Sequence, residues 1–452
     1  MTGSRMQIAP MIIIAATIAT GACDTAIGPG EAVSSDVVVA WNDRVLAVAE
    51  AEDRFLTLKG LRTATMMHLA MHDALSAIEP RYGTYRLSAT EAVAYGNADP
   101  VAAANEAAYA VAIAQYPDSE PSFAEVRSRF AGDASGGAAA RALGEQAAAA
   151  VLAEREGDGW DAAPEYEWHP MGPGVYAEFN EHSGTPEGFV FGAGWAQARP
   201  FALLSPDQFR TGPPPEITSD AYTEAFDEVK DVGATESANR TPDQAHFAMW
   251  WKQFVEKSHN RLARELVTAE DPGLWAAEDP GLWAAARMFA LLNAGIYDGY
   301  IASFDSKFHY NHWRPYTAIR WASNDGNPDT ADDPDWTNMH DHTYAFPSYP
   351  SAHGTVCAAA MTVLADAFGD DRPFDMTIRE VDSAGPMSPP MAMDPATRSF
   401  DSFAAAAEEC ALSRVYLGIH FRYDSEAGTV LGRNVGQRVL DSLLVPVTTG
   451  GR

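Results

Sequence analysis

Residues 413–424 have the sequence Ser-Arg-Val-Tyr-Leu-Gly-Ile-His-Phe-Arg-Tyr-Asp, which places an arginine and a histidine six positions apart. On one α-helix of 3.6 residues per turn, Arg414 and His420 would face different sides. Gly418 lies between them and can end the helix with a backbone turn. We therefore expect the helix that carries Arg414 to end near Gly418, so that His420 returns toward the same site. Alone, the stretch is more typical of a core helix with a surface arginine and a buried histidine.

A second stretch, residues 349–354, reads Tyr-Pro-Ser-Ala-His-Gly and precedes an apolar run. Ser351 is a typical N-cap, so the pattern predicts a buried helix that begins after Ser351 and ends near Gly369. The backbone N–H groups at a helix start favour an oxyanion. The stretch is therefore either a capped structural helix or a cradle for an anion with His353 on its rim.

A third stretch, residues 307–315, contains Lys307 and the pair Arg314-Pro315. One continuous helix would place the two cations on one face, because they are seven positions apart. Pro315 disfavours helix at Arg314, so we expect a break there. The alternative is an aromatic core segment with solvated cations.

The three stretches together supply groups that suit a tetrahedral oxyanion: Lys307, Arg314 and Arg414 as cations, Ser351 as a donor, and the imidazoles of His353 and His420. Their order and spacing resemble the vanadium haloperoxidase and type 2 phosphatidic acid phosphatase superfamily. Its signature is Lys, six residues, Arg-Pro; then Pro-Ser-Gly-His; then Ser-Arg, five residues, His, three residues, Asp. Every position matches except that Ala352 replaces the glycine, and the wider sequence resembles the bacterial haloperoxidase branch.

The resemblance implies a vanadate-dependent haloperoxidase that oxidises halide with hydrogen peroxide to hypohalous acid, which then reacts with an organic acceptor. It implies that His420 would bond the vanadium, and that His353 would be the acid–base residue. Lys307, which also belongs to the implied catalytic set, would neutralise the vanadate oxygens together with Arg314 and Arg414. The Ser351 hydroxyl and the Ala352 backbone N–H would donate to the same oxygens.

Two other functions stay open. The same site could hold a phosphomonoester instead of vanadate, with His420 attacking phosphorus and His353 protonating the leaving oxygen. The chain could also be a non-catalytic lipoprotein that binds phosphate. Phe346, seven positions before His353, matches a phenylalanine of chloroperoxidases, and Phe304 stands where relatives often carry tryptophan.

Composition limits the partners and the compartment. The 452 residues suffice for one large or two ordinary domains, and the formal charge of −31 makes nucleic acid an improbable partner. Residues 1–23 resemble an export signal, with Arg5 before a short apolar run, which predicts a periplasmic or extracellular protein. Cys23 follows Thr-Gly-Ala and resembles a lipoprotein cleavage site, so membrane attachment through lipidated Cys23 is one alternative and ordinary secretion the other. The sequence does not give the oligomeric state.

Helical periodicity dominates the chain and strand-like alternation is scarce, so we predict an all-α fold of helical bundles with the anion site in the C-terminal bundle. After the signal we expect an N-terminal helical region with long loops over residues 24–240 and a catalytic helical bundle over residues 241–452. The expected helices cover residues 54–78, 101–114, 123–156 with a break at 132–137, 221–232, 243–254 and 284–304. Residues 157–218, rich in glycine, proline and aromatic residues, predict a long ordered loop that covers or shapes a site.

Four other features have less specific patterns. Cys357 and Cys410 could form a disulfide or remain two buried thiols. The acidic run Asp325–Asp335 lacks the spacing of an EF-hand, so we expect a solvated loop in preference to a calcium site. His340-Asp341-His342 is expected on a loop surface, since no further zinc ligands are placed beside it. His68 and His72, four apart, are expected in a helix core.

Overall fold

The computed structural model describes residues 33–87, 97–132, 137–269 and 281–447. The expected export signal with Cys23 lies outside these residues. So does most of residues 270–285, where the sequence EDPGLWAA occurs twice in succession. The described chain is helix-rich, which confirms the predicted all-α class. No helix in these ranges combines the length and the apolar character needed to cross a bilayer.

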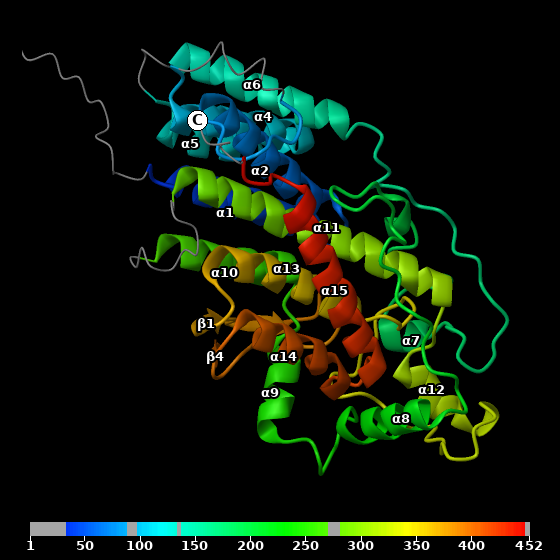
Figure 1. The fold of residues 1–452 in the computed structure, drawn as a ribbon. Helices are drawn as coiled ribbons and strands as arrows, with labels where there is room; N and C mark the ends of the chain where they lie inside the picture. The colour runs from blue at the N-terminus through cyan, green and yellow to red at the C-terminus, as the bar shows by residue number, and fades with distance from the viewer. Residues whose placement is uncertain (1–32, 88–96, 133–136, 270–280, 448–452) are drawn as a thin grey trace, which may run out of the picture.

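The first part of the chain forms a layer of helices at the top of Figure 1. Its elements are α1 (Asp36–Asp53), α2 (Lys59–Ile78), α4 (Pro100–Gln115), the 3₁₀ turn η1 (Pro117–Ser119), α5 (Glu120–Arg129) and α6 (Gly137–Glu154). The helix predicted to begin at Arg54 begins instead at Lys59. Arg54 and Phe55 have φ angles of 55° and 60°, and this left-handed backbone ends the preceding helix.

The second part builds the bundle that carries the three sequence stretches. Its helices are α8 (Asp220–Val232), α9 (Pro242–Trp250), α10 (Val255–Thr268), α11 (Leu282–Tyr310), α12 (Pro315–Trp321) with the 3₁₀ turn η4 (Ala322–Asn324), α13 (Ala352–Phe368), α14 (Phe403–Tyr416) and α15 (Arg422–Ser442). α11 crosses the middle of the molecule and packs against both α2 and α13 (Figure 1). One continuous hydrophobic core therefore joins helices of both parts, and the division at residue 240 stays a prediction.

α13 and α15 pack closely because α15 presents glycines to α13. A Cβ on Gly432 would overlap the carbonyl oxygen of Thr355, and a Cβ on Gly428 would lie 2.5 Å from the carbonyl oxygen of Ser351. Both distances are shorter than real Cβ contacts. The glycines thus let α15 approach the start of α13, which fixes the N-cap of α13 beside the start of α15.

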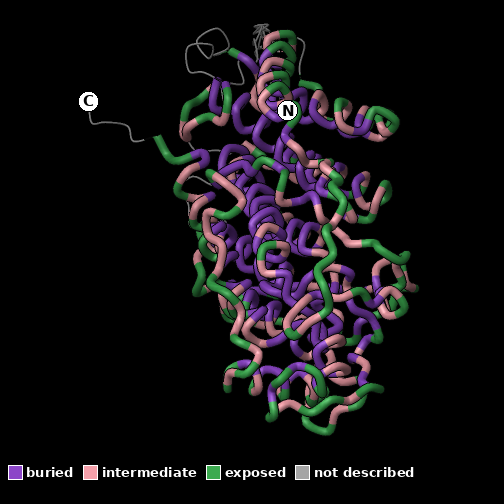
Figure 2. The backbone as a smooth tube through the Cα atoms, turned by 90° about the vertical axis from the view of Figure 1, so that its right-hand side faces the viewer, coloured by how far each residue is buried: buried purple, intermediate pink, exposed green. Residues whose placement is uncertain are grey.

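The predicted long loop region is ordered and contains only short helical turns, α7 (Asn180–Ser183) and η2 (Trp195–Gln197). It runs down the right side of the molecule in Figure 1, past α11. Figure 2 shows buried backbone through the centre of the molecule, with the exposed residues concentrated in the outer loops and turns. The carbonyl oxygen of Ala345 accepts from the N–H of Phe191 at 2.8 Å, which ties this region to the segment before α13.

Two small antiparallel sheets between α13 and α14 were not predicted. β1 (Phe374–Thr377) pairs with β4 (Thr397–Phe400), and β2 (Glu380–Asp382) pairs with β3 (Pro390–Ala392). These strands are three or four residues long, too short for a clear alternating pattern. Tertiary contacts hold them, as when Trp250 Nε1 at the end of α9 donates to the Ala396 carbonyl oxygen at 2.8 Å.

Candidate anion site

The three sequence stretches meet in one buried site. Lys307 Nζ donates to the carbonyl oxygens of Pro347 and Ser348, at 2.9 and 2.6 Å, just before the second stretch. Arg314 Nη1 donates to the carbonyl oxygen of Ile419 at 2.9 Å, in the turn of the first stretch. The N–H of Ser351 donates to the carbonyl oxygen of Asp424 at 2.9 Å. Each stretch is therefore hydrogen-bonded to another, as the spacing predicted.

The turn that returns His420 to the site forms where the sequence placed it. α14 ends at Tyr416, and Gly418 has a φ of +76°, a conformation that favours glycine. A Cβ at Gly418 would lie 2.7 Å from Cβ of Asn338. Arg314 is extended at the N-cap of α12, and α11 already ends at Tyr310, so Lys307 and Arg314 do not share a helix face.

His420 is held in one tautomer by its neighbours. Its Nδ1 lies 2.8 Å from Oδ2 of Asp424, and its Nε2 lies 3.0 Å from Nη1 of Arg314. Because a guanidinium can only donate, Nε2 must be the accepting nitrogen and Nδ1 must carry the proton. Burial, followed by the charges of Arg314 and Lys307, lowers the pKa of His420 well below its usual value. The imidazole is therefore neutral, with its lone pair on Nε2.

Asp424 orients His420, a role that the sequence analysis did not assign although the residue ends the signature. Its Oδ2 also accepts from the Ser348 hydroxyl and, at 3.1 Å, from the N–H of Phe421. Burial raises the pKa of Asp424 to about 7, while the Ser348 hydrogen bond and the charge of Lys307 act in the opposite direction. A carboxylate on the far nitrogen of an imidazole is the arrangement that orients histidine ligands in metal sites.

The cations around His420 are buried and incompletely paired. Lys307 and Arg314 have no exposed surface, and Arg414 is 3% exposed. Burial lowers the pKa of all three, that of Arg314 to about 10. Within the described part of the chain, Arg314 Nη2 and Arg414 Nε are buried without a hydrogen-bond partner. Unpaired buried donors are costly, so a bound anion with several acceptor oxygens would stabilise this cluster.

Ser351 and Ala352 form the start of α13, with Ser351 as the N-cap. The Ser351 hydroxyl oxygen accepts from the N–H of Gly354 at 3.2 Å, so this hydroxyl caps the helix and retains its own proton to donate. Ala352 is 6% exposed and contributes to the wall of a cavity, with its backbone N–H in the first turn. The positive end of the α13 dipole adds to the attraction for an anion.

His353 lines the same cavity as His420 and Arg414. Its Nε2 is buried without a hydrogen-bond partner among the described residues. Burial, followed by the charge of Arg414, lowers the pKa of His353 well below its usual value. A neutral imidazole with a free nitrogen beside the cluster can accept a proton from a bound molecule.

The site opens into a cavity of about 540 Å³ whose walls are mostly apolar and include several aromatic side chains. Phe346 lies over the cations of the cluster, with its ring centroid 5.1 Å from Lys307 Nζ and 4.6 Å from Arg314 Cζ. The long loop region supplies one wall through residues 183–195, in keeping with its predicted covering role. Phe304 packs at an angle against Phe346, with 5.2 Å between ring centroids.

The chain resembles known vanadium haloperoxidases in sequence. Residues 287–447 match the family model described as the VCPO second helical-bundle domain. Vanadium chloroperoxidase of Curvularia inaequalis is 27% identical over 286 residues, which are 52% of this chain and 44% of that protein. The resemblance to vanadium haloperoxidases is confirmed. The alignment spans less than half of the length of the Curvularia inaequalis protein.

Solved structures of vanadium haloperoxidases share the fold. A bacterial vanadium-dependent iodoperoxidase superposes with a TM-score of 0.67 at 23% identity, over 92% of this chain and 99% of that one. The holo form of a bacterial vanadium-dependent chloroperoxidase superposes with a TM-score of 0.62 at 18% identity, over 84% of this chain and 90% of that one. At these identities the likeness concerns the fold.

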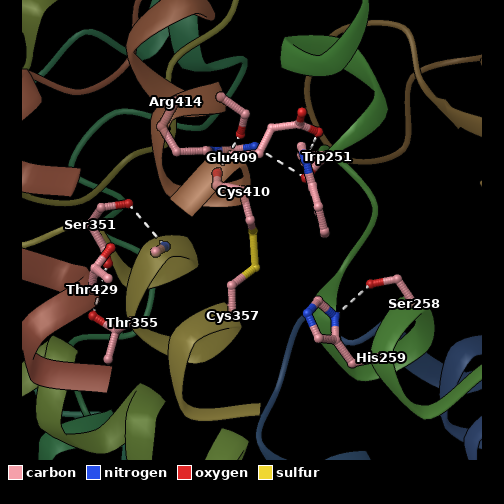
Figure 3. Close-up of a disulfide and its surroundings, with 12 residues drawn as sticks. Trp251, Ser258, His259, Ser351, Thr355, Cys357, Glu409, Cys410, Arg414 and Thr429 are labelled. Carbon is pink, nitrogen blue, oxygen red and sulfur yellow. Dashed lines mark hydrogen bonds between the residues drawn. A yellow bond between two sulfur atoms is a disulfide. The ribbon is translucent and has the colours of Figure 1, made fainter. Parts of the chain in front are cut away.

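A disulfide lies one turn from two residues of the haloperoxidase signature. Cys357 on α13 is bonded to Cys410 on α14, which decides between the two expectations for these cysteines (Figure 3). Cys357 follows His353 by four positions, and Cys410 precedes Arg414 by four. In Figure 3 Arg414 reaches toward the carbonyl oxygen of Trp251, to which its Nη1 donates at 3.4 Å. The bond thus joins the two helices that carry His353 and Arg414.

The prediction for the His340-Asp341-His342 triplet is wrong in part. His340 is 5% exposed and His342 is 8% exposed, so both rings are buried and only Asp341 lies at the surface. The side chain of Asn338 holds this turn by bonding the N–H and the carbonyl oxygen of His342, at 3.1 and 2.7 Å. A short polar triplet does not by itself indicate whether its side chains are buried, because their burial depends on the segments that cover them.

The remaining candidate ligands have structural partners. Asp325 is 4% exposed, and its carboxylate accepts from the N–H of Asn327 and the hydroxyl of Thr330, each at 2.7 Å. This first carboxylate of the acidic run therefore holds its own loop. His68 and His72 lie in the core of α2 without exposed surface, as expected, and the ring of His68 stacks on Phe289 at 5.2 Å.

Proposed function

We propose that this protein is a vanadate-dependent haloperoxidase that oxidises halide with hydrogen peroxide to hypohalous acid. The observation that carries the proposal is the buried set of Arg314 Nη2, Arg414 Nε and His420 Nε2 around one cluster. The first two are donors without partners among the residues that the structure describes, and the third is an accepting nitrogen of a neutral imidazole. A metal oxyanion satisfies both kinds of group at once.

Each residue has a defined task in this proposal. His420 would hold the vanadium through Nε2, with Asp424 keeping the proton on Nδ1. Lys307, Arg314 and Arg414 would balance the negative charge, and the Ser351 hydroxyl and the Ala352 N–H would donate to the oxygens. Bound vanadate would supply Lewis acidity toward peroxide without changing its oxidation state. 

His353 completes the arrangement as the acid–base residue. Its free Nε2 would take up and return a proton at the wall of the cavity. The aromatic rings around the cavity, including Phe304 and Phe346, would limit the water around the reacting groups. We further propose export from the cytoplasm, on the pattern of residues 1–23, with lipidation at Cys23 as the alternative to free secretion.

The geometry also suits the second candidate, a phosphomonoester hydrolase. A neutral histidine backed by a carboxylate can attack phosphorus, and His353 could protonate the leaving oxygen. The two functions use the same residues, so the reaction must be measured. Purified protein treated with a chelator is reconstituted with orthovanadate and assayed for peroxide-dependent oxidation of chloride, bromide and iodide. Hydrolysis of p-nitrophenyl phosphate is assayed in parallel without vanadate.

The expected result is halide oxidation that requires both vanadate and peroxide and is lost in His420→Ala. His309→Ala serves as the matched control, since His309 is an exposed histidine in the last turn of α11. Ester hydrolysis that vanadate inhibits, with no halide oxidation, would favour the phosphatase. Phosphate binding with neither activity would leave a non-catalytic phosphate-binding protein.

A further inference from the structure

Lys252 lies on the cavity wall and has no task in the proposed function. It lies two residues after the end of α9, is 7% exposed, and its Nζ donates to the carbonyl oxygens of Asp382 and Ala384 at 2.5 and 2.6 Å. An ammonium group has three donors, and these carbonyls use two of them. One N–H of a buried cation therefore remains for a molecule in the cavity.

His342 lies beside Lys252 on the same wall. Its ring packs on Gly385, so closely that a Cβ there would lie 2.5 Å from Nδ1, and Gly385 follows the residue whose carbonyl Lys252 binds. Burial, followed by the charges of His182 and Lys252, lowers the pKa of His342 to about 3. His342 Nε2 is buried without a partner among the described residues, although its ring lines the cavity. With the imidazole proton on Nε2, a ligand acceptor at this point would satisfy both groups.

The rest of the cavity is mainly apolar and suits an apolar ligand group. The aromatic side chains on its walls include Phe189, Phe191, Trp195, Phe254, Phe304 and Phe346. The volume of about 540 Å³ is in the range of small-molecule sites and far exceeds that of a halide ion. No aspartate or glutamate is among the described residues that line the cavity. The fitting occupant has an apolar, flat body and one anionic end.

We propose that the cavity binds aromatic carboxylic acids, with the carboxylate on Lys252 and His342 and the ring system between the aromatic walls. The inference deepens the proposed function, because it names a class of organic acceptor, and it rests on that function only for the acceptor role. The bound ring would lie in the cavity that His353 and His420 also line.

The state of Lys252 agrees with this assignment. Burial, followed by the charge of Arg414, lowers the pKa of Lys252 to about 7. A carboxylate beside the amine favours the ammonium form and so regains the interaction that burial weakens. An uncharged ligand could accept a hydrogen bond from this cation but would lack the charge–charge attraction.

Binding is tested by calorimetric titration of the full chain with 2-naphthoate and with the neutral 2-naphthamide, without vanadate or peroxide. A charge-assisted hydrogen bond predicts that the wild type binds the carboxylate about tenfold more tightly than the amide. Lys252→Met, which keeps the length of the side chain without its charge, is expected to abolish this preference and to retain amide binding. Arg414→Met is the matched control in the inner cluster and is expected to retain the preference.

Each outcome decides the proposal. Equal binding of the two ligands by the wild type, no binding of either, or a preference retained in Lys252→Met would overturn it. Loss of the preference in Arg414→Met alone would place the carboxylate on the inner cluster and overturn it as well. If Lys252→Met bound neither ligand, Lys252→Arg would decide, because a restored carboxylate preference supports the proposal and its absence refutes it. Failure of halide oxidation would leave these binding results unaffected.

Discussion

Removing the Cys357–Cys410 disulfide tests how the two helices of the site are held together. The bond closes a loop across 53 positions between α13 and α14, and both cysteines have no exposed surface. Cross-linking stabilises mainly by restricting the unfolded chain, with an entropy that grows with the logarithm of the loop length. For a loop of this size the relation gives about 4 kcal/mol of stability at 25 °C.

The same loss predicts a modest change in melting temperature, because the unfolding entropy of a chain of 452 residues is large. At about 2.1 cal/mol/K per residue, a loss of about 4 kcal/mol lowers Tm by only about 4 °C. Urea unfolding at a fixed temperature is the more sensitive assay, since the free energy is read directly from the transition.

The design is a double-mutant cycle of Cys357→Ala, Cys410→Ala and the double variant. Each single substitution already breaks the bond, so all three variants should lose nearly the same stability. If each single variant lost little stability and the two losses added up to that of the double variant, the coupling free energy would be zero. That result would refute the cross-link. Titration of thiols in denatured wild-type protein provides an independent check, since only Cys23 could then react.

Three further predictions concern the anion site, the helix packing and the pH dependence. Asp424→Asn should lower vanadate affinity about 10- to 100-fold, because the neutral amide no longer fixes His420 as the carboxylate does; undiminished affinity in equilibrium dialysis would contradict this role. Gly432→Ala should destabilise the fold by about 2 kcal/mol in urea, since the new methyl group meets the backbone oxygen of Thr355, and unchanged stability would show that the helices can separate freely. Glu256 is 3% exposed and burial raises its pKa from 4.5 to about 7, so the stability that it contributes is complete below pH 4.5 and lost as the pH rises through 7. Relative to wild type, Glu256→Gln should therefore gain about 3 kcal/mol between pH 4.5 and pH 8, and a parallel pH profile of the two proteins would argue against it.

The sequence by itself determined the helical class and the inner part of the site, although α10 and α15 were not among the expected helices. Ser351 marked the start of α13, Pro315 marked the start of α12, and Gly418 marked the turn that brings His420 back toward Arg314. These are local rules of capping, proline geometry and glycine conformation, so they act through neighbouring residues in the chain. The signature spacing added which of these segments meet.

Only the tertiary structure decided what surrounds that inner site. Asp424 was visible at the end of the signature, but its hold on His420 Nδ1 depends on the turn that places the two side chains face to face. Lys252 and His342 carry no pattern that indicates a cavity wall. They meet there because the hairpin of residues 380–392 folds over both. Local spacing fixes where a helix begins and ends, whereas burial, tautomers and unpaired donors depend on segments that lie far apart in the chain.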